Sequence, residues 1–254
     1  MDLLPAVDLM GGGAVRLVQG DFDRRSDYGD PVALARRYAD AGARWVHVVD
    51  LDAARTGEPA NRGVVTAIAG ELAPSGVRVQ AGGGVRTAED VDELLAGGVA
   101  RVVLGTAALE EPRRAVEAAA RHPGAVAVGL DYRPRPDGSL EAAARGWLEG
   151  SGRTVAEVLA RLEGAPVAAV VVTAIERDGT LAGPDTNGLA AVLDATAIPV
   201  VASGGVGSVA DLRALAALRS PGAGRVLAGA VVGRALVDGR VDAEEAIAAC
   251  APSG

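Results

Sequence analysis

An internal repeat constrains the fold of this chain more than any other feature. Val7-Asp8-Leu9 matches Leu130-Asp131-Tyr132, and the glycine-rich segment 79–85 matches segment 200–206. A third pair, at Gly105 and Gly233, lies near the end of each copy. All three pairs are separated by about half the chain, a period much longer than that of solenoid repeats. The repeat therefore predicts two fused half-barrels related by a near-twofold axis.

Short, valine-rich apolar runs alternate with helical patterns along the whole chain, which is typical of repeated β-α units. The expected strands are Leu3–Leu9, Trp45–Leu51, Val77–Ala81, Arg101–Leu104, Val126–Tyr132, Ala168–Thr173, Pro199–Ala202 and Arg225–Gly229. A doubly wound open sheet competes with a closed barrel, because alternation alone does not decide closure. Two copies of a four-unit half favour closure, so we predict a single α/β domain over residues 1–254, a (β/α)8 TIM barrel with internal half-barrel duplication.

Helix start signals support this division into units. Asp30-Pro31 offers an N-cap followed by a proline in the first helical turn. Capping boxes are predicted at Thr87–Asp90, Thr154–Glu157, Ser208–Asp211 and Asp242–Glu245. Such caps are structural and carry no information about function.

Composition excludes several classes of function. The net charge of −8 disfavours nucleic-acid binding, which needs a basic face. All 25 basic residues are arginine, so Schiff-base chemistry through a lysine is excluded. No long apolar run or basic-then-apolar leader is visible, so we expect neither a membrane span nor a secretory signal, and hence a cytoplasmic location. The lone Cys250 indicates a buried residue on the last helix.

Three aspartates are the candidate catalytic residues. Asp8 and Asp131 end the first and fifth apolar runs, so they should face each other across the barrel mouth. Two carboxylates in a half-buried site can have their pKa values separated, which leaves one as base and the other as acid. Asp178 lies in the loop after the sixth run, where an Asp-Gly turn is a purely structural alternative. Thr173, at the end of that strand, can orient a carboxylate or a substrate hydroxyl.

Glycine-rich turns follow the third, fourth, seventh and eighth strands. Each lets backbone N–H groups approach an anion at the start of a helix. The paired turns predict two phosphate sites on opposite sides of one mouth, and therefore a small-molecule substrate with a phosphate at each end. The residues expected to bind it are Gly83, Gly84, Gly105 and Thr106 in one half, and Ser203, Gly204, Gly205, Gly233 and Arg234 in the other.

Two further segments are expected to close over the substrate. Arg16 and Arg145 offer planar forks for phosphate or carboxylate, and Trp147 offers a face for stacking a heterocycle. His47 lies inside the second apolar run and is interpreted as a satisfied core histidine, and His122 as incidental. The spacing of histidine, cysteine and carboxylate residues predicts no metal site.

The motifs together resemble the phosphoribosylformimino-aminoimidazole-carboxamide ribotide isomerases of histidine biosynthesis over nearly the whole chain. Those that carry the resemblance are Leu4-Pro-Ala-Val-Asp8, Val15-Arg-Leu-Val-Gln-Gly20, Val48-Val-Asp-Leu51, Gly82-Gly-Gly-Val-Arg86, Gly129-Leu-Asp131, Arg145-Gly-Trp147, Arg177-Asp-Gly-Thr-Leu181 and Ala202-Ser-Gly-Gly-Val206. The resemblance implies an Amadori rearrangement of an aminoaldose to an aminoketose, without metal or organic cofactor. We expect the protein to be a monomer.

Carried onto this chain, the resemblance makes Asp8 the base that removes the C2 proton of the opened sugar. Asp131 or Asp178 would be the acid that opens the ring, and Gly20 joins the substrate-binding residues. The chain departs from the family at Ala174, where an acidic residue commonly follows the threonine, and this bears on how Thr173 and Asp178 are oriented.

Three alternatives follow. The cyclase of the same pathway typically has Cys-Leu-Asp on its first strand, whereas this chain has Ala6-Val7-Asp8. The bifunctional actinobacterial isomerases, which also act on phosphoribosylanthranilate, share Arg145-Gly-Trp147 but tend to have serine at the position of Gly82. A non-catalytic phosphometabolite-binding barrel would keep the glycines but need not keep the aspartates. We expect the histidine-pathway substrate to be preferred.

Overall fold

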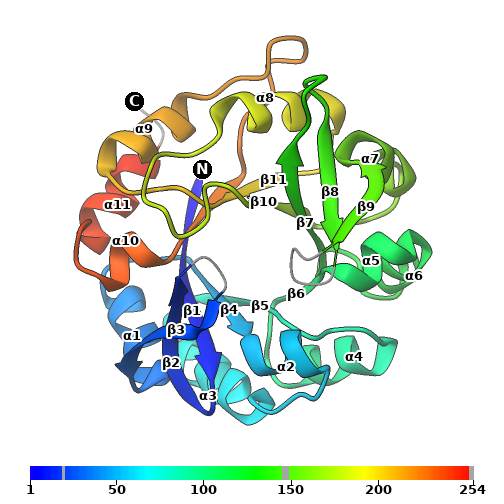
Figure 1. The fold of residues 1–254 in the computed structure, drawn as a ribbon. Coiled ribbons are helices and arrows are strands. Elements are labelled where there is room, and N and C mark those ends of the chain that lie inside the picture. Colours follow the sequence, from blue (N-terminus) through cyan, green and yellow to red (C-terminus); the bar gives the residue numbers. More distant parts are fainter. Residues whose placement is uncertain (19–20, 145–148, 252–254) are drawn as a thin grey trace.

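The computed structural model describes residues 1–18, 21–144 and 149–251 (Figure 1). Within these residues eight parallel strands close into a ring, since β12 pairs with β1 and each remaining strand pairs with its neighbour. The ring runs β1 Asp2–Met10, β4 Trp45–Asp50, β5 Arg78–Gly82, β6 Arg101–Leu104, β7 Val126–Pro134, β10 Ala169–Ala174, β11 Val200–Ser203 and β12 Gly229–Val232. The predicted (β/α)8 barrel is confirmed, and the open sheet is wrong.

Helices surround this ring on its outer side (Figure 1). They are α1 Pro31–Asp40, α2 Leu51–Thr56, α3 Arg62–Leu72, η1 Ala73–Ser75, α4 Ala88–Ala96, α5 Thr106–Glu110, α6 Pro112–Arg121, α7 Val155–Leu162, α8 Thr186–Ala195, α9 Val209–Ala217, α10 Arg234–Val237 and α11 Ala243–Cys250. The N-terminal amine donates to the carbonyl of Cys250 at 3.0 Å, so the start of the barrel is joined to the end of its last helix.

Two antiparallel hairpins extend the barrel at equivalent places. Strands β2 Gly13–Val18 and β3 Asp21–Gly29 follow β1, and strands β8 Leu140–Ala144 and β9 Glu149–Thr154 follow β7. Each hairpin pairs antiparallel with the barrel strand before it. Because β1 and β7 begin the two copies of the sequence repeat, the extra hairpins belong to the repeated unit.

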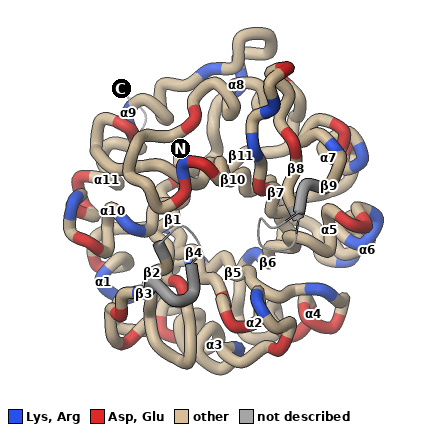
Figure 2. The backbone as a smooth tube through the Cα atoms, viewed as in Figure 1, with Lys and Arg blue, Asp and Glu red and all other residues tan. Residues whose placement is uncertain are grey.

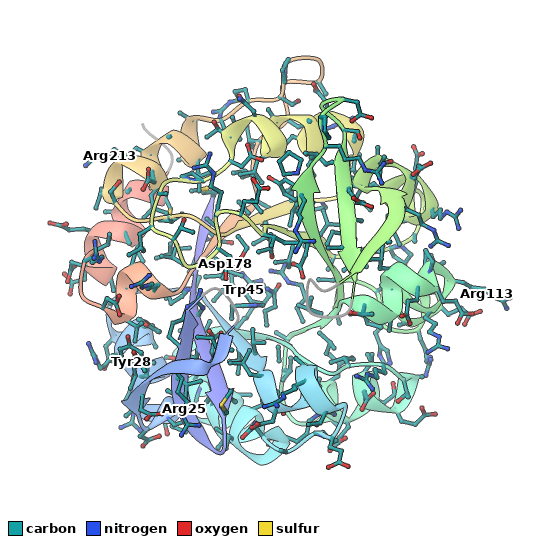
Figure 3. The ribbon with its side chains drawn as sticks, in the orientation of Figure 1. Arg25, Tyr28, Trp45, Arg113, Asp178 and Arg213 are labelled. Carbon is teal, nitrogen blue, oxygen red and sulfur yellow. The ribbon has the colours of Figure 1, made fainter. Side chains whose placement is uncertain are left out.

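The strands alternate between two separate apolar clusters, because successive side chains point to opposite faces of a sheet. On β1, Leu4 and Ala6 belong to the small cluster inside the ring, whereas Val7 and Leu9 pack in the large cluster beneath the helices. Trp45 is the large side chain of the inner cluster, and Figure 3 shows it within the ring. The barrel is thus a packed core with polar residues on its inner face near one end.

The helix caps follow the sequence signals. Asp30 accepts from the N–H of Val32, and both Thr87 and Thr154 form complete capping boxes. The other two boxes are only partly formed. Ser208 caps α9, but the Asp211 carboxylate accepts from the N–H of Gly207. The Asp242 carboxylate accepts from the backbone N–H groups of Glu244 and Glu245.

The prediction for the eighth strand is wrong in position. The expected run Arg225–Gly229 shares only Gly229 with β12, which covers Gly229–Val232. Arg225 donates to the carbonyls of Leu193 and Asp194 at the end of α8, and Val226 is 49% exposed. Segment 225–228 is therefore a connection fastened to α8, and the buried strand begins after it.

Acidic and basic side chains are interspersed over the outer helices in Figure 2, whereas the ring of strands carries few of them. None of the helices among the described residues combines the length and hydropathy that a membrane crossing requires.

Ile68→Ala should lower the free energy of unfolding by about 2–5 kcal/mol, because Ile68 is completely buried on α3 and its removal leaves a cavity. Val226→Ala is the matched control, with an expected change within about 0.5 kcal/mol at this half-exposed position. Urea unfolding followed by circular dichroism measures both. Equal effects of the two substitutions would contradict the packing of α3 against the barrel.

Candidate active site at the carboxyl ends of the strands

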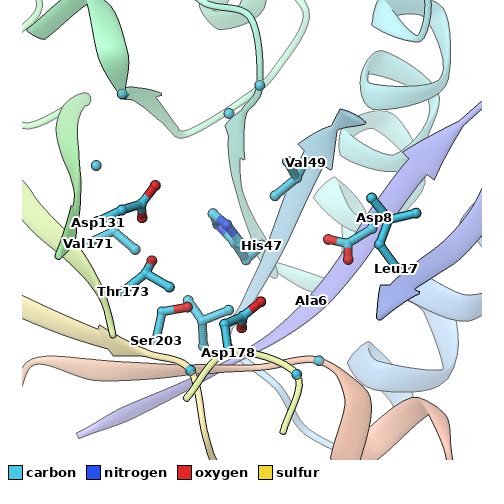
Figure 4. Close-up of a pocket in the computed structure, with 18 of the residues that line it drawn as sticks. Ala6, Asp8, Leu17, His47, Val49, Asp131, Val171, Thr173, Asp178 and Ser203 are labelled. Carbon is cyan, nitrogen blue, oxygen red and sulfur yellow. The ribbon is translucent and has the colours of Figure 1, made fainter. Parts of the chain in front are cut away.

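A pocket of about 350 Å³ lies at the carboxyl ends of the barrel strands, where such barrels hold their active sites (Figure 4). The structure brings most of the predicted site residues together in its lining. These are Asp8, Arg16, Gly83, Gly105, Thr106, Asp131, Thr173, Asp178, Ser203, Gly204, Gly205, Gly233 and Arg234.

Four predicted residues differ from this group. Gly84 is not part of the lining, and a Cβ at its position would lie 2.5 Å from the Cβ of Ala53, so Gly84 packs against α2. Gly20, Arg145 and Trp147 lie outside the described residues.

Arg16 joins two of the three aspartates. Its Nη1 donates to Oδ2 of Asp8 at 2.6 Å, and its Nη2 donates to Oδ1 of Asp178 at 3.4 Å. Arg16 reaches this place because β2 folds back on β1, which sets Asp8 opposite Val15 in the register. Two carboxylates from distant parts of the chain are therefore held beside one guanidinium.

Asp131 lies on the opposite wall of the pocket. Its strand β7 is four places from β1 around the ring, and Figure 4 shows Asp131 and Asp8 on opposite sides. Thr173 is paired with Asp131 in the register of β7 and β10. The expectation that Asp8 and Asp131 face each other across the mouth agrees with this arrangement.

Burial and neighbouring charges shift the pKa values of Asp178 and Arg16. Burial raises the pKa of the Asp178 carboxyl, the guanidinium of Arg16 lowers it by a smaller amount, and the charge of Asp8 adds to the rise. Burial alone would lower the pKa of Arg16, but the two carboxylates outweigh it and the net shift is upward. Arg16 therefore stays charged, and Asp178 takes up a proton more readily than an ordinary aspartate.

The loop that carries Asp178 lies directly on the glycines that follow β11. A Cβ at Gly205 would lie 2.3 Å from the carbonyl oxygen of Gly183, and one at Gly207 would lie 2.5 Å from that of Leu181. Leu181 itself has a φ of 61°, a strained conformation for a residue with a side chain. Arg234 donates from Nη1 to the Gly179 carbonyl at 2.7 Å. The position of Asp178 is thus set by backbone contacts on two sides.

In the first half, too, a glycine after a strand packs closely against the backbone of a neighbouring segment. A Cβ at Gly83 would lie 2.2 Å from the carbonyl oxygen of Asp50, at the end of β4. The buried Asp50 carboxylate accepts from the N–H of Ala53 and from both the backbone and the side chain of Asn61. Asn61 in turn accepts from the N–H of Gly12 in the turn between β1 and β2. These bonds fix the loop beneath Gly83.

Gly105 and Gly233 occupy equivalent places as the N-cap residues of the short helices α5 and α10. The first N–H groups of a helix have no partner within it, so they can donate to an anion. Arg16 Nη1 would lie 2.9 Å from a Cβ at Gly233, so the guanidinium lies against the second-half turn. Its buried Nε has no hydrogen-bond partner among the described residues.

His47 is a polar residue of the pocket lining that the sequence did not predict as part of the site. It is buried, as expected of a core histidine, but it also lines the pocket and bonds Gln80 through Nδ1 at 2.7 Å. The sequence contains a signal for this position. Every second residue of β4 points to the inside of the barrel, and His47 lies two residues from both Trp45 and Val49 on that inner face. Among the described residues no group of histidine, cysteine and carboxylate side chains could hold a metal ion.

Ala174 has its side chain in the outer cluster, beneath the helices, while its neighbour Thr173 lines the pocket. The departure from the family pattern at this position therefore changes the packing behind β10. It removes no side chain from the pocket.

The comparisons with known proteins agree on one family. A family model described as "Histidine biosynthesis protein" matches residues 2–242. A protein of a Synechococcus species is 47% identical over 254 residues, covering 100% of this chain and 94% of its own length. One of Dinoroseobacter shibae is 46% identical over 252 residues, covering 99% and 100%. Both are named 1-(5-phosphoribosyl)-5-((5-phosphoribosylamino)methylideneamino) imidazole-4-carboxamide isomerase.

Asp178→Asn should gain stability relative to the wild type as the pH rises from about 3 to about 7. The pKa of Asp178 is raised in the folded protein, so its stabilising contribution is present below the unfolded pKa and is lost as the pH rises through the folded pKa. Asparagine does not titrate and escapes this loss. Urea unfolding of both proteins at the two pH values measures the difference.

Asp137→Asn is the control, for which the stability difference from the wild type should change with pH in the opposite direction. The pKa of this exposed carboxyl is lowered, chiefly by the hydroxyl of Ser139, so the wild type gains stability over the same pH range and the variant does not. A difference for Asp178→Asn that is constant with pH would contradict the raised pKa.

Proposed function

Because the chain belongs to the histidine biosynthesis protein family, we propose that it catalyses the reaction for which its relatives are named. The reaction is the isomerisation of 1-(5-phosphoribosyl)-5-((5-phosphoribosylamino)methylideneamino) imidazole-4-carboxamide. It converts an aminoaldose into an aminoketose by moving protons within one molecule. The enzyme is an aldose-ketose isomerase of the histidine pathway.

One observation carries the assignment of the chemistry to this pocket. Asp8 and Asp178 meet at Arg16, between two glycine turns that occupy equivalent places in the two halves. A substrate with a phosphate at each end can span the mouth between the turns. The sugar carbons that exchange protons would then lie above the carboxylates. Proton transfer between carboxyl groups and substrate is sufficient for this reaction, so the proposal includes no cofactor.

We assign the general base to Asp8. The carboxylate of Asp8 accepts from Arg16 near the end of β1 and lines the pocket. In the opened sugar it would remove the proton from C2, while the imine nitrogen accepts the electron pair. The resulting enolamine becomes the ketose when a proton is returned to C1 and the proton of the C2 hydroxyl passes to the acid that opened the ring, which replaces the proton given to the ring oxygen.

Asp178 is the better of the two candidate acids. Opening the furanose ring requires a proton at the ring oxygen, and burial raises the pKa of Asp178 towards the range where it can supply one. Asp131 faces the pair from the opposite wall, beside Thr173 in the register. We assign these two residues to hydroxyl groups of the substrate, where they would hold the sugar over Asp8.

The phosphates are assigned to the two symmetry-related turns. In the first half the N–H groups of Gly83, Gly105 and Thr106 would surround one phosphate. In the second half Ser203, Gly204, Gly205, Gly233 and Arg234 would surround the other, with Arg16 beside Gly233. Gly20, Arg145 and Trp147 stay predictions as further contacts to the substrate.

We also propose that the whole chain acts as one domain and as a monomer in the cytoplasm. Described residues from both halves of the same chain meet in the pocket, so a second copy is not required to supply these groups. A biosynthetic substrate with two phosphates is a metabolite of the cytoplasm. Light scattering at micromolar concentration tests the oligomeric state.

Asp8→Asn should fold normally and lose about 10²–10⁴-fold in kcat, because only the ionised carboxylate can accept the C2 proton. Steady-state kinetics with the named substrate measures the loss. Binding of the product, measured by calorimetry, should survive, since the phosphate turns are unchanged. A variant that keeps more than about a tenth of the wild-type kcat would rule out Asp8 as the base.

Gly233→Ala should raise KM at least about tenfold, because the added methyl group would lie 2.9 Å from Arg16 Nη1 at the second phosphate turn. Gly70→Ala on α3 is the control, since a Cβ there meets nothing within 4 Å and the KM should be unchanged. A crystal structure with product should place one phosphate at each turn. Two phosphates in the same half would refute the symmetric assignment.

A further inference from the structure

A row of three polar side chains crosses the inner wall of the barrel one layer below the carboxylates. His47, Gln80 and Arg101 are neighbours in the register of β4, β5 and β6, and His47 is paired with Ala6 of β1. Arg101 Nε donates to Gln80 Oε1 at 2.5 Å, and Gln80 Nε2 lies 2.7 Å from His47 Nδ1. Gln80 is completely buried, and His47 is where the row reaches the pocket.

The donors in this row determine where the proton of His47 must lie. A guanidinium only donates, so the Gln80 atom that faces Arg101 is the acceptor oxygen. The amide NH₂ of Gln80 therefore faces His47, and it too only donates. Nδ1 of His47 must accept, so the single proton of the neutral ring lies on Nε2.

We propose that Arg101 and Gln80 are positioning residues that hold His47 as a neutral Nε2–H donor to a sugar oxygen of the substrate. The choice of substrate rests on the proposed function. Because Gln80 occupies Nδ1, Nε2 is the ring nitrogen left to bond a ligand in the pocket. Figure 4 shows the ring between Asp8 on one side and Asp131 on the other.

The substrate oxygen on C2 is the acceptor that we assign to the Nε2–H group of His47. It stays a hydroxyl in the enolamine that forms when Asp8 removes the C2 proton, and it becomes a carbonyl when C1 is protonated and the hydroxyl proton passes to the Asp178 carboxylate. A neutral imidazole can polarise the carbonyl in a sugar-phosphate isomerisation, and it keeps its own proton throughout. His47 would therefore stabilise the developing carbonyl without competing with Asp8 and Asp178 for protons.

The electrostatics of the row agree with this geometry. Burial lowers the pKa of His47 to about 4, and the positive charges of Arg101 and Arg16 contribute to the decrease. Burial and the charge of Arg78 lower the pKa of Arg101 to about 10, so Arg101 remains charged at neutral pH. Both Arg78 and Arg101 lie over the ring of Trp45, at 4.1 and 4.3 Å from its centroid.

The tautomer can be read directly by ¹⁵N NMR, because the chain contains only two histidines. His122→Asn identifies the remaining signal as His47. In the wild type we expect a neutral ring with the proton on Nε2 and no titration between about pH 5 and about pH 8. A proton on Nδ1, or a ring that titrates in this range, would overturn the proposal.

Gln80→Glu is the isosteric test of the positioning role. One carboxylate oxygen can still accept from Arg101, but the other now accepts from His47 and moves the ring proton to Nδ1. Above the new pKa of His47, Nε2 can no longer donate and kcat should fall about a hundredfold, with KM changed less than about threefold. As the pH falls through that pKa the ring becomes charged, Nε2–H returns and kcat should recover relative to the wild type.

Apart from the carboxylate that the substitution itself introduces beside Nδ1, the charged groups around His47 are the same in this variant and in the wild type. They come from five elements and one loop. Asp8 on β1, Arg16 on β2, Asp131 on β7, Asp178 after β10 and Arg234 on α10 line the pocket, and Arg101 on β6 belongs to the row itself. Arg78→Met is the matched control, because it removes the other cation over Trp45 and leaves the contacts of Gln80 unchanged. It should keep the Nε2–H tautomer and the wild-type kcat.

A second pair of variants tests the row if Gln80→Glu does not fold. Arg101→Lys keeps a cationic donor to Gln80 and should keep the Nε2–H tautomer, whereas Arg101→Met should give a mixture of tautomers. The same tautomer in both Arg101 variants would overturn the proposal. The proposal would also be overturned if Gln80→Glu moved the ring proton to Nδ1 and kcat stayed the same as in an active wild type. A wild type without isomerase activity would instead refute the proposed function.

Discussion

Closure of the parallel sheet is the constraint on which the site depends. In a closed ring every second residue of each strand points at the same axis, so residues distant in sequence meet without any contact of their own. Asp8, His47, Asp131 and Thr173 lie in one pocket for this reason. Their strands are held in register by backbone hydrogen bonds, which do not depend on the identity of these side chains. Polar residues can therefore occupy the mouth while apolar side chains such as Leu4, Trp45 and Val103 fill much of the interior.

The small size of the interior residues has a second consequence. Positions such as Ala6, Ala127 and Ala169 leave space within the ring, and Trp45 fills much of it from one strand. The Gln80 amide is completely buried on the inner face of β5, and burying a polar group is costly unless it is hydrogen-bonded. Arg101 and His47 satisfy it on both sides. The interior thus keeps one polar row, and this row ends at the floor of the active site.

The sequence predicts most of the strands and the placement of Asp8 and Asp131 on opposite sides of the pocket, because both follow from local apolar patterns and from the repeat. It misplaces the eighth strand, since the exposure of Val226 depends on the bonds of Arg225 to α8, a contact that no local pattern contains. It also misses the place of His47 in the pocket, because this depends on which alternate residues of β4 point to the inside of the barrel. The ion pairs of Arg16 with Asp8 and Asp178 depend on how a hairpin and a loop fold over the mouth.

The glycines show how one duplicated scaffold can support an asymmetric reaction. Gly84 and Gly205, which are equivalent in the repeat, both pack against the segment that follows the neighbouring strand, so the scaffold of the two halves is the same. The loops themselves differ: the buried carboxylate of Asp50 bonds Asn61 and supports its own loop, whereas Asp178 enters the pocket and meets Arg16. Two similar turns suit the two similar phosphates of the proposed substrate. Proton transfer at one sugar needs different groups on its two sides, and the divergence of these loops provides them.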